Sequence, residues 1–490
     1  MKKLLCIFLL IFFSISFAYS ESVSINLDSS VKTSTANYYL EGGLSDSLGG
    51  AINAEGDFYN IDVNLSLIND GKYPTHSSFQ LGHYFYTTES VAEIFFGDLS
   101  FSAGRGVHTD VVDTPYSIYV NPEALPSVYA EAVYSGDLFS YQSRWVRLNE
   151  RSAQLYNGNI DSNPDTPDYI RDRGMTFKTY ALDLGNLRIG LEDVSLYLDR
   201  SFDSESFLSP FPMYFLEMLN TSGGRPWSEI SNTNSLMGFF SEYEKSDLYL
   251  QGQILVDDIN ASILAPALGW AIPSLNNITN LSKVAWSLGG HYDTPFGRIG
   301  LYHGGALKYT FEATYTNSTS YSSLPYEYTY YPITEYNSGG GYSPMDYTEN
   351  YIGYKYGENN ISFLIDYQNQ FFTNNPYSFD LYTSLEWILN GSKSPSNPWH
   401  EYTSWTEIDV PYELLSDDVI EHTLKLQTTI SKPYRNWLFT VDGGIGYVWN
   451  RLELVELVSN EPKIYVPISG NNHLLASLSI SASYLFKIKK

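Results

Sequence analysis

The last stretch of the chain, Leu474 to Lys490, alternates between apolar and polar residues at almost every step. Because successive side chains of a β-strand point to opposite faces, this period of two predicts a strand with one apolar and one hydroxyl-rich face. At roughly 3.3 Å per residue the strand would be about 50 Å long, whereas soluble strands usually have about five or six residues. The length favours a tilted strand that crosses a bilayer, with even positions facing lipid and the serines facing a lumen. The alternative is a long edge strand of a secreted β-sandwich.

The same alternation recurs throughout the chain and predicts an all-β fold. The segments with apolar residues on one face are Val23–Leu27, Tyr59–Leu67, Val128–Tyr134, Phe139–Trp145, Leu187–Leu191, Leu248–Val256, Leu307–Phe311, Ile361–Phe371, Tyr377–Trp387, Ile420–Ile430 and Trp437–Trp449. The raw tally of candidate strands is odd, whereas single-chain bacterial barrels have even numbers, so we expect a transmembrane antiparallel β-barrel of about 18 strands. Either Tyr351 to Tyr356 is not a strand, or Glu401 to Val410 contains a further one.

The connections between these segments alternate between tight and long. Tight turns are expected at 135–137, 185–186, 244–247, 293–297, 357–360 and 432–436. Long connections are expected at 104–127, 149–173, 199–234, 260–282, 316–350, 390–417 and 452–472. Bacterial outer-membrane barrels have this asymmetry, with short periplasmic turns and longer external loops. A β-sandwich does not predict it.

The N-terminus has the plan of a secretory signal peptide over residues 1–20. Two lysines precede an apolar run from Leu4 to Phe17, and Ala18-Tyr19-Ser20 provides a small-x-small cleavage site. Export and cleavage would leave one domain over residues 21–490, placed in the bacterial outer membrane by the barrel-assembly machinery. Cleavage would also remove Cys6, the only cysteine, so the mature chain would have neither disulfides nor a thiol nucleophile.

Composition narrows the classes of function. The chain has 43 Tyr, 26 Phe and 9 Trp but only 17% charged residues, a balance that suits strands and the two aromatic belts of a membrane barrel. No later stretch approaches about 18 uninterrupted apolar residues, which excludes helical spans but not barrel strands. The formal net charge of −27 argues against nucleic acid as a partner, because phosphate contacts need clustered Lys and Arg. The acid excess suits traffic of cations or neutral glycans, although acidic secreted proteins are also common.

Two segments do not have a strand pattern. Ser209 and Pro210 read as the cap and first residue of a short amphipathic helix, which continues through an apolar stripe to a stop at Gly223-Gly224. Ala261 to Ile272 is apolar but interrupted by proline. Both segments either fold into the lumen as a plug or pack on the rim of the barrel.

The alternation also assigns faces, which gives candidate luminal polar residues. These are Gln142, Arg144, Arg188, Gln251, Gln253 and Asp257. Arg and Asp side chains on opposing walls would create a transverse field or hydrogen-bond a sugar. Alternatively, they only pair with loops that fold into the lumen.

Two long connections are rich in aromatic residues and are candidates for ligand contact. A tyrosine ring offers a flat apolar face for the C–H side of a pyranose and a hydroxyl for its OH groups. The candidate ligand-binding residues are Tyr326, Tyr328, Tyr330 and Tyr331 in the first connection and Trp399 and Trp405 in the next. The alternative is that these rings pack loop on loop and cap the barrel.

A weak candidate metal site lies in the connection 149–173. Asp161, Asn163, Asp165 and Asp172 have oxygen ligands at calcium-loop spacing, but Thr166 stands where such a loop needs glycine. Asx turns on a solvated loop explain the pattern equally well, so we expect no metal and no cofactor. The sequence has neither an HExxH nor a GxSxG motif, and we expect no enzymatic activity. A Ser, His and Asp group assembled across strands would leave no such motif.

Two segments resemble the Wzi family of capsule-assembly proteins. The run Leu248 to Asp258 (LYLQGQILVDD) is similar to an LYGQFLIDD-type strand of that family, and Phe207 to Phe215 (FLSPFPMYF) resembles the proline-aromatic segment that precedes it. Gly104-Arg105-Gly106 stands where a glycine-arginine element is expected. The resemblance implies a largely plugged outer-membrane barrel of about 18 strands that acts as a surface lectin for capsular polysaccharide.

The leading hypothesis is therefore a non-enzymatic outer-membrane barrel that contacts lipid and binds or organises surface polysaccharide through aromatic external loops. The alternative is a general porin for small solutes, and the two differ in whether the lumen is plugged or open. A third class, a barrel hydrolase, would turn over lipid or peptide through a luminal Ser or His.

Tyr484 and Phe486 are expected to anchor the last strand at the periplasmic interface, with Lys487 to Lys490 just outside the membrane. Replacing Phe486 by Asp should impair membrane assembly, because the substitution places a charge against interfacial lipid. The fraction of heat-modifiable, folded protein measures this effect. Unchanged folding of the Phe486→Asp variant would contradict the anchoring role.

Overall fold

The computed structural model describes residues 22–37, 40–69, 82–124, 126–150, 172–221, 224–226, 233–258, 282–311, 334–336, 342–344, 353–372, 377–393, 412–455 and 464–489. The strands of this part are β1 (Ser22–Asn37), β2 (Leu40–Gly56), β3 (Tyr59–Asn69), β4 (Tyr84–Tyr86), β5 (Ser90–Phe96), β6 (Leu99–Gly106), β7 (Ser127–Ser135), β8 (Phe139–Asn149), β9 (Arg173–Asp183), β10 (Leu187–Leu198), β11 (Thr233–Lys245), β12 (Leu248–Asp258), β13 (Lys283–Thr294), β14 (Gly297–Ala306), β15 (Thr334–Tyr336), β16 (Tyr342–Pro344), β17 (Asn360–Phe371), β18 (Phe379–Asn390), β19 (Glu421–Tyr434), β20 (Trp437–Trp449), β21 (Leu452–Val455), β22 (Ile464–Pro467) and β23 (His473–Lys489). Its helices are α2 (Ser204–Leu208) and α3 (Met213–Thr221).

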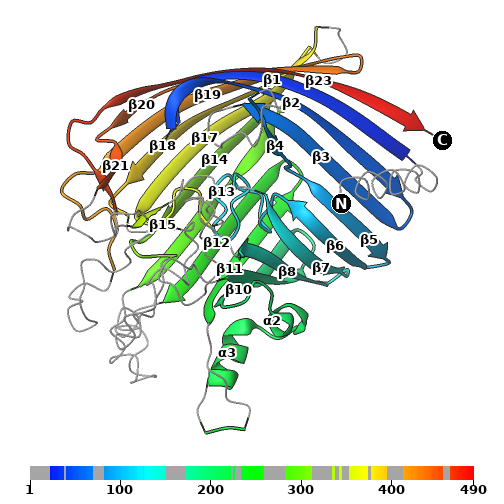
Figure 1. Cartoon of the computed structure of the whole chain (residues 1–490), viewed down its shortest axis with the longest axis vertical. Coiled ribbons are helices and arrows are strands. Elements are labelled where there is room, and N and C mark those ends of the chain that lie inside the picture. Colours follow the sequence, from blue (N-terminus) through cyan, green and yellow to red (C-terminus); the bar gives the residue numbers. More distant parts are fainter. Residues whose placement is uncertain are drawn as a thin grey trace.

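Strand pairing runs round a ring. One sheet of 19 strands includes the three-residue β4, which lies on the same edge of β3 as β5, so 18 strands remain without it. Each pairs antiparallel with the preceding and the following long strand, and β23 pairs with both β20 and β1. Figure 1 shows β1 and β23 side by side. The predicted antiparallel barrel of about 18 strands is confirmed.

The two ends of the barrel differ in their connections. Turns of two or three residues join β2 to β3, β5 to β6, β7 to β8, β9 to β10, β11 to β12, β13 to β14 and β19 to β20. All of these turns lie at the end where β23 finishes, and the long connections lie at the other end. In the turn between β9 and β10, Gly185 has φ of 77°, a conformation that glycine adopts without strain. The predicted asymmetry of short turns and long loops is confirmed.

Two predictions for the connection between β14 and β17 are wrong. Leu307 to Phe311 does not extend a strand, because β14 ends at Ala306 and the next residues form a turn in which Tyr309 and Phe311 have positive φ. Both rings are buried, so their alternation reflects packing in the interior and not strand pairing. Residues 357–360 form no hairpin, since β14 pairs directly with β17.

The odd number of candidate strands is explained by a segment of the same connection that is not a strand. Residues 353–356, the described part of Tyr351 to Tyr356, are not a strand. This was one of the two alternatives, and Glu401 to Val410 lies outside the described residues.

Apolar side chains on the outer faces of the strands are exposed, whereas the inward side chains next to them are buried. In β13, Leu288 is 53% exposed while the adjacent Ser287 is buried, and in β14, Leu301 is 61% exposed while Tyr302 is buried. Exposed apolar side chains on the outward faces of so many of the described strands are the reverse of a soluble protein, and they match the lipid-facing surface of a membrane barrel.

The connection between β6 and β7 fills part of the interior. We call its described part, Val107–Ala124, the inner loop. Tyr116, Ile118 and Tyr119 are fully buried in one apolar cluster with side chains of β8 to β14 and β17. A short segment can touch that many neighbouring strands only from the concave side of the sheet, so the inner loop lies within the barrel.

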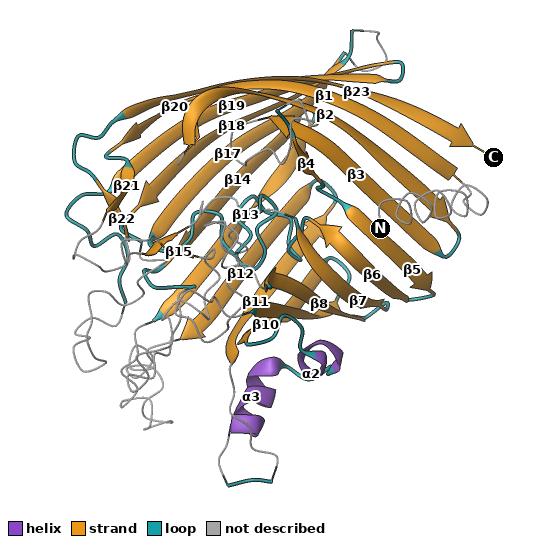
Figure 2. Ribbon diagram, viewed as in Figure 1, coloured by secondary structure: helices purple, strands orange, loops and turns teal. Residues whose placement is uncertain are grey.

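The connection between β10 and β11 lies on the outside. We call Asp199–Thr221, with α2 and α3, the outer segment. Helix α2 contacts β8, and α3 contacts β10 and β11 (Figure 2). Outward-facing Ser143 donates to the carbonyl of Phe207, which fixes the side. The prediction that this segment fills the lumen or sits on the rim is therefore wrong.

The helix boundaries also differ from the prediction. Helix α3 begins at Met213 and not after a cap at Ser209. The reason is tertiary, because Asp193 of β10 accepts hydrogen bonds from the backbone N–H groups of Met213 (2.5 Å) and Tyr214 (3.3 Å). A side chain of the barrel wall thus caps the helix. Ala261 to Ile272 lies outside the described residues, and within the described ranges no helix is long and apolar enough to cross a membrane.

Candidate functional site

The inner loop is held against the wall by hydrogen bonds to polar side chains of β12 and β13. Gln251 donates to the hydroxyls of Thr114 (3.1 Å) and Ser287 (3.2 Å). Tyr119 donates to the carbonyl of Ile254 (3.0 Å). These bonds satisfy polar groups that burial has removed from water, and the loop therefore behaves as part of the interior.

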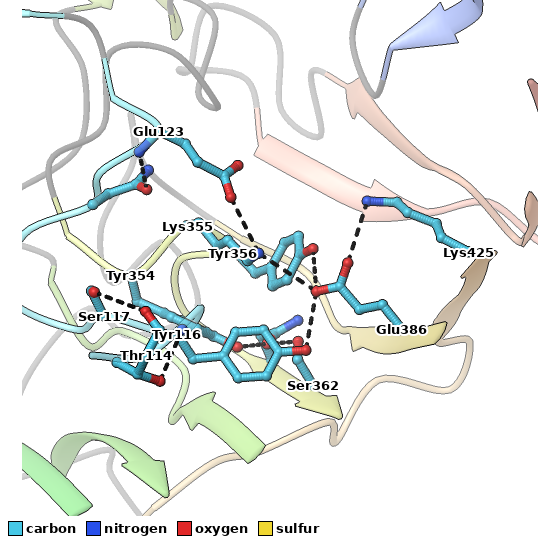
Figure 3. A network of polar contacts seen from close by, with 12 residues as sticks. Thr114, Tyr116, Ser117, Glu123, Tyr354, Lys355, Tyr356, Ser362, Glu386 and Lys425 are labelled. Atoms are coloured by element: carbon cyan, nitrogen blue, oxygen red, sulfur yellow. Dashed lines mark hydrogen bonds and ion pairs between the residues drawn. The ribbon is translucent and has the colours of Figure 1, made fainter. Parts of the chain in front are cut away.

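A cluster of tyrosines and charged residues lies where the inner loop meets β18 (Figure 3). We call Tyr116, Lys355, Tyr356, Glu386 and Lys425 the luminal cluster. The Glu386 carboxylate accepts hydrogen bonds from Tyr116 (3.0 Å) and Tyr356 (2.7 Å), and the two lysine ammonium groups lie 3.6 and 3.9 Å from it. Four chain segments that are distant in sequence thus meet at one carboxylate.

The luminal cluster also contains cation–π contacts. The ammonium of Lys355 lies 5.2 Å from the ring centres of both Tyr116 and Tyr356, and that of Lys425 lies 5.6 Å from Tyr356. Burial lowers the pKa of Lys355, but the carboxylates of Glu386 and Glu123 outweigh burial and leave that pKa above its ordinary value. Lys355 is therefore a permanent cation at neutral pH.

The luminal cluster keeps one accessible side. The Lys425 side chain is 33% exposed, whereas those of Lys355 and Glu386 are 13% and 11% exposed. Tyr356 is half-buried beside it. An ammonium next to a tyrosine face offers a solute one charged donor and one flat apolar surface, the combination that orients polar ligands in concave sites.

Gln142 and Arg144 of β8 lie beside Glu131 of β7. Arg144 is buried, pairs with the Glu131 carboxylate (3.1 Å) and donates to the carbonyl of Thr109 in the inner loop (2.8 Å). Gln142 also donates to Glu131. The luminal charges were expected either to create a transverse field or to pair with loops inside the lumen. Arg144 does the second, because it binds the inner loop.

The other predicted luminal residues also have partners. Arg188 pairs with Asp183 and Glu242, and Gln253 donates to both carboxylate oxygens of Glu192. Gln251 binds the inner loop as described above. Asp257 pairs with Lys283 at 3.4 Å, and both side chains are buried. Each of the six residues therefore has a local partner, and they do not form the opposed rows of Arg and Asp that a transverse field would need.

A pocket of about 400 Å³ lies between the inner loop and the wall near the short turns. Its lining includes Val111, Gln142, Thr179, Asp183 and Arg188. Two of the residues predicted from alternation therefore share one hollow, which has a carboxylate and a guanidinium at its edge.

The structure leaves several candidate residues untested. Residues 312–333 and 394–411, which contain all of the predicted ligand-binding aromatics, lie outside the described residues. The same holds for three of the four weak metal candidates, and Asp172 lies just before β9. Within the described ranges, no group of three His, Cys, Asp or Glu side chains could hold a metal ion.

The last strand has the register expected of a closing strand. Phe486 of β23 is opposite Ile25 of β1. The ring of Tyr484 lies 4.8 Å from that of Trp437 in β20. An aromatic pair at the end with the short turns agrees with an interfacial belt.

Two features of the sequence point to the luminal cluster, although none of its residues is among those predicted above. Glu386 falls at an even position of a strand whose apolar residues, Leu381, Leu385 and Trp387, are odd, so alternation already points it inward. The apolar run Ile118 to Val120 inside a long connection indicates a buried loop. The contact of Tyr116 in this loop with Tyr356 could not be predicted, because the two residues lie in different connections that share no pattern in the sequence.

The comparisons concern the fold. No family model and no curated protein matches the sequence. Among solved structures, the chain is similar to Wzi of Escherichia coli, an outer-membrane protein involved in group 1 capsule assembly and described as a carbohydrate-binding β-barrel. The identity is 12% over 98% of this chain and 87% of Wzi, with a TM-score of 0.52. The chain has an outer-membrane β-barrel fold.

Two further solved structures, both of Pseudomonas aeruginosa proteins, are also similar. OccD3 matches at 11% identity and a TM-score of 0.47 over 96% of this chain and 92% of its own. OprD matches at 8% identity and a TM-score of 0.47 over 96% and 95%. Identities this low carry no information on ligands.

Replacing Glu386 by Gln should loosen the inner loop, because it leaves Lys355 buried without its main counter-charge. Breaking a buried ion pair costs about 3 kcal/mol, which corresponds to roughly a hundredfold faster amide exchange in the inner loop. Hydrogen exchange read by mass spectrometry checks this. The control is Glu123→Gln, since the Glu123 side chain is 66% exposed and its ion pair contributes about 1 kcal/mol or less. Equal exchange in the two variants would contradict the central role of Glu386.

Proposed function

We propose that the protein is a Wzi-like, non-enzymatic protein of the bacterial outer membrane that binds or organises surface polysaccharide of capsular type. The observation that carries the proposal is the inner loop, which contacts the inside of the barrel from β8 round to β18 through fully buried side chains. A barrel built to pass solutes freely has no use for that core. In a barrel that holds external loops in place for binding, such a buried core would make the support rigid.

The chemistry of the loops supports a glycan as the ligand. The connection between β14 and β17 contains Tyr326, Tyr328, Tyr330 and Tyr331, and the next connection contains Trp399 and Trp405. The strands that flank these connections meet them at the end of the barrel opposite the short turns. Aromatic faces at that end suit the C–H faces of sugars, and the hydroxyls suit their OH groups.

A small-solute porin is the second candidate, and one observation favours it. Away from the inner loop, polar side chains on the inner faces of β2, β3, β19 and β20 remain partly exposed, among them Asn53, Asp62, Gln427 and Asp442. This polar sector is what a water-filled path along one wall would need.

Binding is tested with purified capsular polysaccharide, with dextran of similar size as a second probe. Replacing Tyr326, Tyr328, Tyr330 and Tyr331 by Ser should weaken polysaccharide binding at least tenfold, because each ring that covers a sugar contributes on the order of 1 kcal/mol. Isothermal titration calorimetry measures the affinity. The control is Tyr434→Ser, an exposed tyrosine beside a short turn, which should bind as wild-type. Equal affinities for all three proteins, or none in wild-type, would reject the proposal.

Conductance separates the two candidates. In planar bilayers the wild-type protein should show little steady current, because the inner loop occupies part of the lumen with buried side chains. Replacing residues 109–120 with a short Gly-Ser linker should raise the current severalfold. Large, steady channels in wild-type that the replacement does not change would favour the porin.

A further inference from the structure

The outer segment lies against a polar patch on an otherwise apolar wall. Its donors are Tyr141, Ser143 and Trp145 of β8 and Lys178 and Tyr180 of β9, and its acceptor is Asp193 of β10. These positions continue the outward faces of the strands, as exposed Leu182 and Ile189 show. Polar side chains at lipid-facing positions of a barrel require a reason.

The reason is the backbone of the outer segment. Lys178, which is fully buried, donates to the carbonyls of Ser209 (2.7 Å) and Phe211 (3.0 Å), and Tyr180 donates to that of Pro210 (3.0 Å). The indole of Trp145 donates to the carbonyl of Ser201 (2.6 Å). In water these carbonyls would be hydrated without help. Irregular backbone at membrane depth is tolerated only where protein groups satisfy it, as the wall does here.

The side chains of the outer segment have the opposite arrangement from those of a surface helix. Phe211, Tyr214, Phe215 and Leu219 point away from the protein and are 39–47% exposed. The only charged residue of α3, Glu217, faces the wall and accepts a hydrogen bond from Ser235 (2.7 Å). A helix that keeps its one charged side chain against protein and turns aromatic and aliphatic side chains outward is stable where the surroundings are apolar.

The position of the helix agrees with lipid contact. Asp193, which caps α3, lies six residues after Leu187 at a short turn, about 20 Å along the strand at roughly 3.3 Å per residue. A strand tilt of about 45° reduces this to about 14 Å of height, within an apolar band about 25 Å tall. The exposed face of α3 is therefore continuous with the lipid-facing wall formed by residues such as Ile189 and Phe239.

We propose that the outer segment is a membrane-embedded flap, whose exposed aromatic face inserts between the acyl chains of the outer leaflet while the polar patch of β8 to β10 satisfies its backbone. The partner is lipid, not a second copy of the chain. This inference does not depend on the ligand of the lumen.

The test uses site-specific fluorescence in the full-length chain with Cys6→Ser. Phe215→Cys and Leu219→Cys are each labelled with NBD and reconstituted in phosphatidylcholine vesicles with or without 5-doxyl phosphatidylcholine. Leu301→Cys on the apolar wall is the lipid control, and Asp418→Cys, exposed in a long connection, is the water control. Heat modifiability confirms that each variant has folded.

Both labels on α3 should be quenched by doxyl lipid to within about twofold of the Leu301 label, and aqueous iodide should quench them several times less than the Asp418 label. Iodide quenching equal to that of the Asp418 label would place the helix in water and overturn the proposal. Protection from both quenchers, or disulfide cross-linking between Phe215→Cys copies, would show that protein covers the face and would overturn it equally.

Discussion

The need to pair every backbone group in a medium without water is the constraint on which this structure depends. The ring of strand pairs meets it for the strands, and the register between β1 and β23, with Val23 opposite Ile488 and Ser34 opposite Ser477, leaves no edge free at the seam. Apolar side chains can then face outward on every strand. The short turns and the chain's last strand meet at one end, and the long connections gather at the other.

The same constraint explains how the two folded-in connections differ. Inside the barrel, Tyr116, Ile118 and Tyr119 of the inner loop pack against apolar side chains on the inner faces of β8 to β14 and β17. Hydrogen bonds to the wall satisfy polar groups of the same loop. The buried Glu386 carboxylate is paired with two tyrosines and two lysines. Such a network specifies one arrangement of the loop, because each partner left alone would be a costly buried polar group.

Outside the barrel, the outer segment meets an apolar medium, and the wall supplies the polar groups. Lys178 and Asp193 sit on outward faces and yet are buried, since carbonyls and N–H groups of the segment cover them. In the polar patch of β8 to β10, outward positions are thus polar where the backbone of the outer segment needs partners. The luminal cluster and the outer segment both show how buried polar groups find partners, the first on the inner face of the sheet and the second on its outer face.

The sequence by itself determined the barrel, its approximate strand number, the asymmetry of its ends and the inward direction of residues such as Arg144 and Gln251. A period of two is a local property, and side-chain direction in a strand follows from it directly. Only the tertiary structure decided where the connections go. The caps of α3, the burial of Tyr309 in a turn and the meeting of Tyr116 with Glu386 depend on partners far away in the sequence, and no local pattern encodes which face of a curved sheet a loop will cover.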